Sequence, residues 1–250
     1  MKKPQPRFLA LWAATLPLLF TGCGPDETPK TNDPGIIIEI PEIPDDIIPS
    51  KPCETLYDNI NEMFVGSVNN KLVHPELFSD TVLKQIVLKE ASEVYVTFIS
   101  SDASFNNTFG WYAYEESNPP QFGSEISWKI LFPNVSEDVL DEGDRLQLGS
   151  DEFPAGTVIG FFLIMQGWED GMVKSKGKTI HFTDSRLNPN HNQQHVLFKE
   201  EECGDIVLSF EDKPVDNFSD KDFNDIIFTI TDNNEELTTT AFDLAKIVVK

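Results

Sequence analysis

A run of carboxylate and amide side chains within residues 210–228 is the part of the sequence best suited to chemistry. Asp220, Asp222 and Asn224 occupy alternate positions, and Asp225 follows directly. Ca²⁺ takes six to eight oxygen ligands at about 2.3–2.6 Å, from carboxylates, amides and backbone carbonyls. Oxygen side chains at i, i+2 and i+4 of a curling loop can converge on one ion. The spacing therefore predicts a calcium site.

Two further acids, Glu211 and Asp212, come at the end of the strand expected before this loop. The predicted ligands are Glu211, Asp212, Asp220, Asp222, Asn224 and Asp225. The loop lacks the Gly and Glu of an EF-hand, so it is not one. The alternative is a polar hairpin loop whose Asp and Asn side chains cap backbone N–H groups. Crowded carboxylates repel each other and a divalent ion relieves that repulsion, which favours calcium.

Aromatic residues beside amides form a second candidate site. Trp111 and Tyr112 follow Asn106 and Asn107 closely, and aromatic faces with amide donors suit carbohydrate. These four residues are therefore candidate ligand-binding residues. The alternative interpretation is that the aromatic residues alternate between the core and the surface of a strand.

Catalytic and zinc sites are less favoured. A glycosidase needs two carboxyls about 5–5.5 Å or 6.5–9.5 Å apart, and Glu211 and Asp212 are the candidates for an acid/base role. Acids on one short loop more naturally share a cation, so no catalytic residue is assigned. Zinc ligation by His181, His191 and His195 is disfavoured, because a proline before the last two and a strand pattern after them argue against a helix.

Strand patterns dominate the elements that would position these residues. Strands are expected at residues 93–100, 126–132, 157–166, 178–182, 194–198, 205–210, 225–231 and 242–249. Residues 157–166 are apolar on both faces, as in a central strand. Helical spacing predicts a helix over 54–64 and a second short one over 80–88. This pattern predicts an all-β fold, an antiparallel, jelly-roll-like β-sandwich with a short helical segment before it.

The N-terminus has the pattern of a secretory signal peptide. Cations precede an apolar run over residues 8–20, which is shorter than the roughly 20 residues of a transmembrane helix. Residues 19–23 resemble a bacterial lipobox, in which Cys23 receives diacylglycerol. The alternative is an ordinary secretory signal with a chance cysteine. We expect residues 1–22 to be removed and the lipid on Cys23 to hold the chain at the membrane, in the outer membrane or at the cell surface.

Composition adds further expectations. Residues 23–52 are rich in proline and acids, which predicts a tether, and residues 53–250 would form one domain. Loss of Lys2, Lys3 and Arg7 with the signal peptide changes the net charge from −23 to −26, which excludes nucleic acid as a partner. Cys53 and Cys203 remain, and a disulfide or two free thiols both fit an oxidising compartment.

Several segments together resemble the bacterial domain of unknown function 4114 (DUF 4114). They are residues 210–212 with 220–228, residues 104–114, residues 160–163 and residues 194–196. The resemblance covers residues 90–231 and implies a secreted or surface-attached bacterial protein. Members of the family carry acidic residues that have prompted suggestions of enzymatic activity without an assigned reaction.

We therefore expect a lipid-anchored, calcium-binding β-sandwich that serves adhesion or glycan binding, with an extracellular glycan or a surface protein as partner. The alternative is an extracellular polysaccharide hydrolase that uses Glu211 and Asp212 as acid and base.

Overall fold

The computed structural model describes residues 33–216, 219–234 and 237–250. The predicted signal peptide and the predicted lipidation at Cys23 lie outside the described residues. In the part of the chain that is described, no helix has the length and apolarity that crossing a membrane requires.

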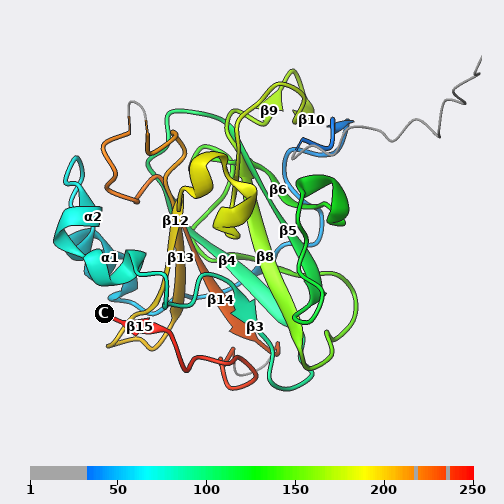
Figure 1. The fold of residues 1–250 in the computed structure, drawn as a ribbon. Helices are drawn as coiled ribbons and strands as arrows, with labels where there is room; N and C mark the ends of the chain where they lie inside the picture. Colours follow the sequence, from blue (N-terminus) through cyan, green and yellow to red (C-terminus); the bar gives the residue numbers. More distant parts are fainter. Residues whose placement is uncertain (1–32, 217–218, 235–236) are drawn as a thin grey trace, which may run out of the picture.

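The larger of two main sheets carries the loop over residues 211–225, which we name the acidic loop (Figure 1). Its strands, in spatial order, are β15 (Val248–Val249), β12 (His195–Lys199), β13 (Ile206–Phe210), β14 (Ile226–Asp232), β4 (Val94–Ser101), β7 (Asp144–Gln147) and β2 (Ile48–Pro49). Neighbouring strands are antiparallel except for the β12–β15 pair, which is parallel. The β13–β14 hairpin brings both ends of the acidic loop together at one end of these central strands, because Phe210 pairs with Ile226.

The second main sheet is antiparallel and carries the aromatic candidates. Its strands, in order, are β11 (Ile180–Phe182), β8 (Thr157–Ile164), β5 (Asn107–Glu115) and β6 (Lys129–Val135), with β3 (Ile86–Val87) also pairing with β8. A small third sheet contains β1 (Ile37–Ile38), β10 (Met172–Lys174) and β9 (Trp168–Glu169).

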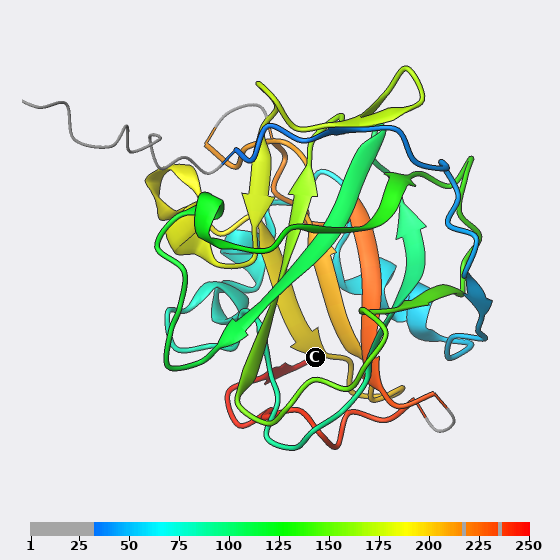
Figure 2. The ribbon, with the colours of Figure 1, turned by 90° about the vertical axis from the view of Figure 1, so that its right-hand side faces the viewer.

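The two main sheets pack face to face around one apolar cluster (Figure 2). Phe109 of β5 stacks on Phe228 of β14 with ring centroids 4.1 Å apart, and Phe132 of β6 stacks on the same ring at 5.9 Å. Strand β8 is buried along its whole length, because a second apolar cluster covers its outer face. The prediction of a mostly β protein with short helices is confirmed.

The helical segments differ in part from expectation. Helix α1 (Leu56–Met63) lies within the predicted helix and buries Leu56 and Ile60. The predicted helix over 80–88 is wrong, because Ile86 is fully buried and pairs with the edge of β8 as part of β3. The short helical turns are instead α2 (Asn70–Val73), η1 (Pro75–Phe78), η2 (Gly123–Glu125), η3 (Ser185–Leu187) and η4 (Pro189–His191). The strand expected over 242–249 is reduced to β15.

Residues 33–50, which we name the strap, lie along the domain. In Figure 2 the strap runs across the top and down the right-hand side in blue. Strand β1 pairs with β10 at one end, β2 pairs with β7 at the other, and Asn134 Nδ2 donates a hydrogen bond to Glu42 at 2.6 Å between them. Ile36, Ile40 and Ile47 pack against the two clusters. This half of the proline-rich segment is therefore held on the domain by its isoleucines and its strand pairing.

A disulfide joins Cys53, just before α1, to Cys203 in the turn between β12 and β13. The Cα atoms are 5.9 Å apart. The bond ties the start of the helical segment to the larger sheet across 150 residues of chain.

Candidate metal centre and ligand cavity

The acidic loop between β13 and β14 buries three of its six carboxylates. Glu211 is 1% exposed, Asp212 is 0% exposed and Asp222 is 4% exposed, whereas Asp220 is exposed. A buried carboxylate costs folding free energy unless it is paired or bound to a metal. This burial therefore needs a compensating partner.

Three of these acids come together at one point. Glu211, Asp220 and Asp222 each offer a carboxylate oxygen, and the three atoms lie within 4.8 Å of one another. Two oxygens that each lie about 2.4 Å from a shared Ca²⁺ are at most about 4.8 Å apart. The spacing therefore allows one cation to contact all three.

Asp212 and Asp225 lie beside this group at the base of the hairpin. Asp225 Oδ2 accepts a hydrogen bond from the Asp212 backbone N–H at 2.8 Å. Asp212 Oδ2 accepts one from Asn107 Nδ2 at 3.0 Å, while its Oδ1 is buried and has no hydrogen-bond partner among the described residues. Asn224 is half-buried, and its amide lies near Gly66. Five of the six predicted ligands are thus carboxylates gathered in one region.

The electrostatics of the loop favour a bound cation. Burial, reinforced by the charges of Asp220 and Asp222, raises the pKa of Glu211 to about 7. Burial, together with the nearby charges of Asp212 and Glu211, raises the pKa of Asp225 to about 8. The pKa values of Asp212 and Asp222 are also raised, with burial as the main cause. A divalent ion would offset both the lost hydration and the mutual repulsion.

The backbone of the loop adopts an unusual conformation to present these acids. Lys221 and Phe223 both have left-handed backbones, with φ of 65° and 59°, which is costly for bulky residues. Phe223 is fully buried and packs on Phe78 with ring centroids 4.9 Å apart. The alternating conformation turns Asp222 inward, where its Oδ2 accepts a hydrogen bond from the Ser67 N–H at 2.8 Å. Packing and the α1–α2 segment together hold the strained loop.

The second sheet supports the same centre from the other side. Asn107 of β5 donates to Asp212, and its Oδ1 accepts a hydrogen bond from the Gln166 N–H at 2.9 Å. His181 of β11 donates from Nε2 to the Asp212 carbonyl at 2.8 Å. Burial lowers the pKa of His181 to about 4, so the ring is neutral near pH 7. Asp212 is therefore fixed by two side chains of the second sheet and by Asp225 of its own loop.

Comparison with known proteins identifies the region that holds this loop. Residues 153–233 match the family described as domain of unknown function, DUF4114. The chain carries a DUF4114 domain. No curated protein and no solved structure matches the chain. The predicted resemblance is confirmed for this stretch, which contains the acidic loop, while the segment 104–114 precedes it.

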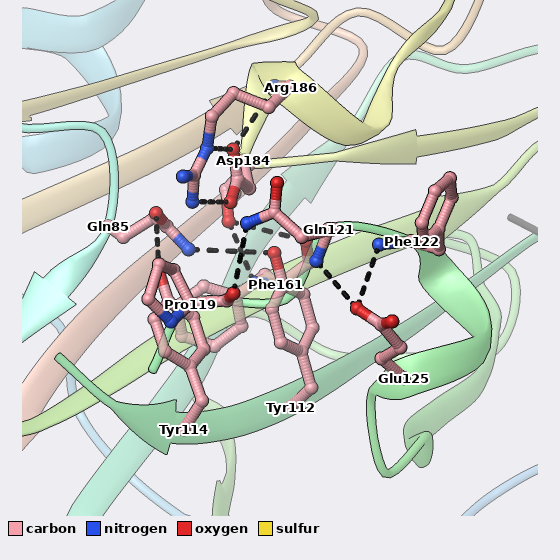
Figure 3. A network of polar contacts seen from close by, with 11 residues as sticks. Gln85, Tyr112, Tyr114, Pro119, Gln121, Phe122, Glu125, Phe161, Asp184 and Arg186 are labelled. Atoms are coloured by element: carbon pink, nitrogen blue, oxygen red, sulfur yellow. Dashed lines mark hydrogen bonds and ion pairs between the residues drawn. The ribbon is translucent and has the colours of Figure 1, made fainter. Parts of the chain in front are cut away.

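The aromatic candidates separate on the two faces of β5, before the DUF4114 match. Tyr112 lies on the face of β5 that points away from the larger sheet, where the second apolar cluster buries it fully. Its ring stacks on Tyr114 with ring centroids 6.2 Å apart. Figure 3 shows the two tyrosines side by side beneath Gln85, near Asp184 and the Arg186 that binds it. Gln85 accepts a hydrogen bond from the Tyr114 hydroxyl at 3.2 Å. Tyr112 therefore presents no free ring face to a sugar.

Trp111 faces the opposite way and lines a cavity of about 460 Å³. One wall comes from the strap and the others from β5, β6, β7 and Gly149. Its lining includes Ile40, Asp45, Asp46, Trp111, Lys129 and Leu131. Asn106 is exposed and does not line it. Sequence reasoning found only Trp111, because the other residues come from distant segments without a shared motif.

The histidines considered for zinc have other partners. His195 of β12 is fully buried and its Nε2 donates to the Lys84 carbonyl at 2.9 Å. His181 contacts Asp212, whereas His191 is exposed in η4. Among the described residues, no histidine belongs to a group of three side chains that could hold a metal.

Proposed function

We propose that this chain is a calcium-binding module of the bacterial envelope, anchored by a lipid on Cys23, that serves adhesion or glycan binding. The observation that carries the proposal is the buried Oδ1 of Asp212, which has no hydrogen-bond partner among the described residues, beside the convergent carboxylates of Glu211, Asp220 and Asp222. A buried anionic oxygen without a partner is costly. A cation at the loop would supply that partner.

The donor set supports calcium over softer metals. Each of the three side chains that converge at the loop offers a carboxylate oxygen, and no cysteine or histidine in the described part of the chain contributes a ligand atom to the group. Oxygen-only sites of several carboxylates suit hard cations, and Ca²⁺ tolerates the irregular geometry of a loop better than Mg²⁺ does. The strained backbone at Lys221 and Phe223 supports a site shaped for binding.

A structural role for the ion is favoured over catalysis. A general acid or base must come within hydrogen-bond reach of its substrate. Glu211 and Asp212 are both at most 1% exposed and lie under the loop. Their burial favours metal ligation over an acid/base role in a polysaccharide hydrolase. A hydrolase activity of the unmodified chain that Glu211→Gln abolishes without unfolding it would contradict this assignment.

An extracellular location is supported by the disulfide, and the architecture supports a rigid framework. The disulfide between Cys53 and Cys203 suits an oxidising compartment, where millimolar calcium is also common. The two main sheets packed face to face support a jelly-roll-like β-sandwich as the rigid framework that carries the loops.

Thermal melting of the purified full chain in detergent tests the calcium proposal. Addition of about 1 mM Ca²⁺ is expected to raise Tm, and EDTA to reverse the shift. Asp220→Asn should abolish the shift, because Asp220 is exposed and its carboxylate belongs to the cluster. Asp216→Asn is the matched control, since Asp216 lies on the same loop and binds Asn190 and Asn192 instead. An identical Tm with Ca²⁺ and with EDTA would overturn the proposal.

A further inference from the structure

The strap begins with an edge strand, β1, that carries exposed isoleucines. Ile37 is 58% exposed and Ile38 is 39% exposed. Ile37 pairs with Lys174 of β10, so it shares a face of the small third sheet with Lys174 and with the half-buried Met172. The preceding Ile36 packs against an apolar cluster of the domain instead. Two consecutive large aliphatic side chains are therefore left in contact with the surroundings at this edge.

The chain is pinned to the domain directly before β1. Ser175 is fully buried, its backbone N–H donates to the Ile36 carbonyl at 2.9 Å, and its hydroxyl donates to Asp33 Oδ1 at 2.7 Å. Asp33 Oδ2 accepts a hydrogen bond from the Gly177 N–H at 3.2 Å. These bonds close the strap onto the domain at Asp33. Any tether between the domain and a membrane therefore has to end there.

The sequence distance between Asp33 and Cys23 limits how far the domain can stand from a lipid on Cys23. Asp33 follows Cys23 by ten residues. An extended chain covers at most about 3.6 Å per residue, or about 36 Å over this stretch. A compact domain of about 200 residues is about 45 Å across. The start of the strap would therefore be held within one domain diameter of the bilayer that receives the lipid.

The acids of the β9–β10 hairpin, which lies beside β1, are paired with lysines. Lys174 Nζ lies 2.7 Å from a carboxylate oxygen of Asp170 and 3.5 Å from one of Glu169, and Lys178 Nζ lies 3.4 Å from Glu169. Lys176, in the turn that follows β10, is exposed and forms no ion pair with any described residue. Although the whole chain is strongly acidic, this corner thus offers a cation to lipid phosphates.

We propose that Ile37, Ile38, Met172 and Lys176 form a membrane-contact surface, which rests on the bilayer that holds the lipid on Cys23. The isoleucines enter the boundary between headgroups and acyl chains, where exposed apolar side chains of peripheral proteins bind. The lysine side chain places its ammonium group among the phosphates. A second copy of the chain fits less well, because β1 offers an edge of only two residues for strand pairing. The inference rests on the proposed lipid anchor and adds a second contact, which orients the domain.

Spin labelling of the full chain, purified with its lipid and reconstituted into vesicles of phosphatidylethanolamine and phosphatidylglycerol, tests the inference. Cys23 carries lipid under the proposal and Cys53 is bonded to Cys203, so Ile37→Cys adds a single free thiol for a nitroxide. Val249→Cys is the matched control, since Val249 is 53% exposed in β15, on the opposite side of the domain from β10 in Figure 1. An aqueous nickel chelate should collide with the nitroxide about fivefold less often at position 37 than at position 249.

Flotation of the same vesicles separates the inference from the anchor on which it rests. Equal access of the chelate to positions 37 and 249, in a chain that floats with the vesicles, would overturn the contact surface and leave the anchor standing. Dipolar broadening between nitroxides at position 37 would assign the surface to a second copy and would also overturn the inference. A chain that does not float would overturn the anchor and the contact surface together.

Discussion

Acidification from about pH 7.5 to about pH 5 is expected to destabilise the chain by about 2 kcal/mol through His195 alone. Burial lowers the pKa of His195 from 6.5 to about 4, and the Lys84 ammonium lowers it slightly further. The hydrogen bond to the Lys84 carbonyl and the charge of Asp184 act in the opposite direction. The neutral ring is therefore the form that the fold accommodates.

The sign follows from proton uptake. Between about pH 6.5 and about pH 4 the unfolded chain binds a proton at His195 and the folded chain does not. The stability that the buried neutral ring contributes is fully present above pH 6.5 and is lost as the pH falls towards 4. At pH 5 the gap of about 1.5 pH units below the unfolded pKa corresponds to about 2 kcal/mol, at 1.36 kcal/mol per unit.

Urea denaturation at both pH values measures this contribution as a difference between variants. His195→Gln keeps an N–H at the position of Nε2 and cannot titrate, so its loss of stability on acidification should be about 2 kcal/mol smaller than that of the unmodified chain. His181 and the loop carboxylates are common to both proteins and cancel. His191→Gln, at an exposed position, is the control. Equal losses in His195→Gln and the unmodified chain would refute the reasoning.

Three further perturbations have defined expectations. Reduction of the Cys53–Cys203 disulfide should destabilise the chain by about 2–5 kcal/mol, seen as a lower Tm in dithiothreitol; no change would show that the cross-link does not constrain the unfolded chain. Asn107→Ala should cost about 2–3 kcal/mol in urea unfolding, because Asp212 and the Gln166 N–H lose their partner, whereas Asn106→Ala at an exposed site should stay within about 0.5 kcal/mol. Phe109→Ala should cost about 3–5 kcal/mol, since this fully buried ring contacts four other phenylalanines, and a loss below 1 kcal/mol would contradict the placement of the core.

Local pattern accounts for what the sequence predicted well. The alternate spacing of Asp220, Asp222 and Asn224 is a property of one short loop, so the cluster could be anticipated without knowing the fold. The apolar run of β8 likewise indicated a strand buried on both faces. Glu211 could be predicted as a ligand for the same reason, because it follows β13 directly and begins the loop.

Long-range packing accounts for what the sequence did not reveal. Residues 80–88 have helical spacing, but pairing with β8 and burial of Ile86 outweigh that local preference. Asn107 supports Asp212 across 105 residues of chain, a relation that no spacing encodes. The cavity beside Trp111 combines the strap with β5, β6 and β7, which no local pattern joins. Strand alternation predicts that Trp111 and Tyr112 lie on opposite faces of β5, but the sequence does not tell which face each of them occupies.

Isothermal titration of calcium into the metal-free full chain tests the central claim most directly. The account predicts saturable binding of at least one Ca²⁺ by the unmodified chain and by Asp216→Asn, and its loss in Asp220→Asn, with the folded structure of each variant checked by circular dichroism. Saturable binding that Asp220→Asn leaves unchanged, or no binding by the folded unmodified chain at millimolar calcium, would contradict the assignment of the loop between β13 and β14 as a calcium site.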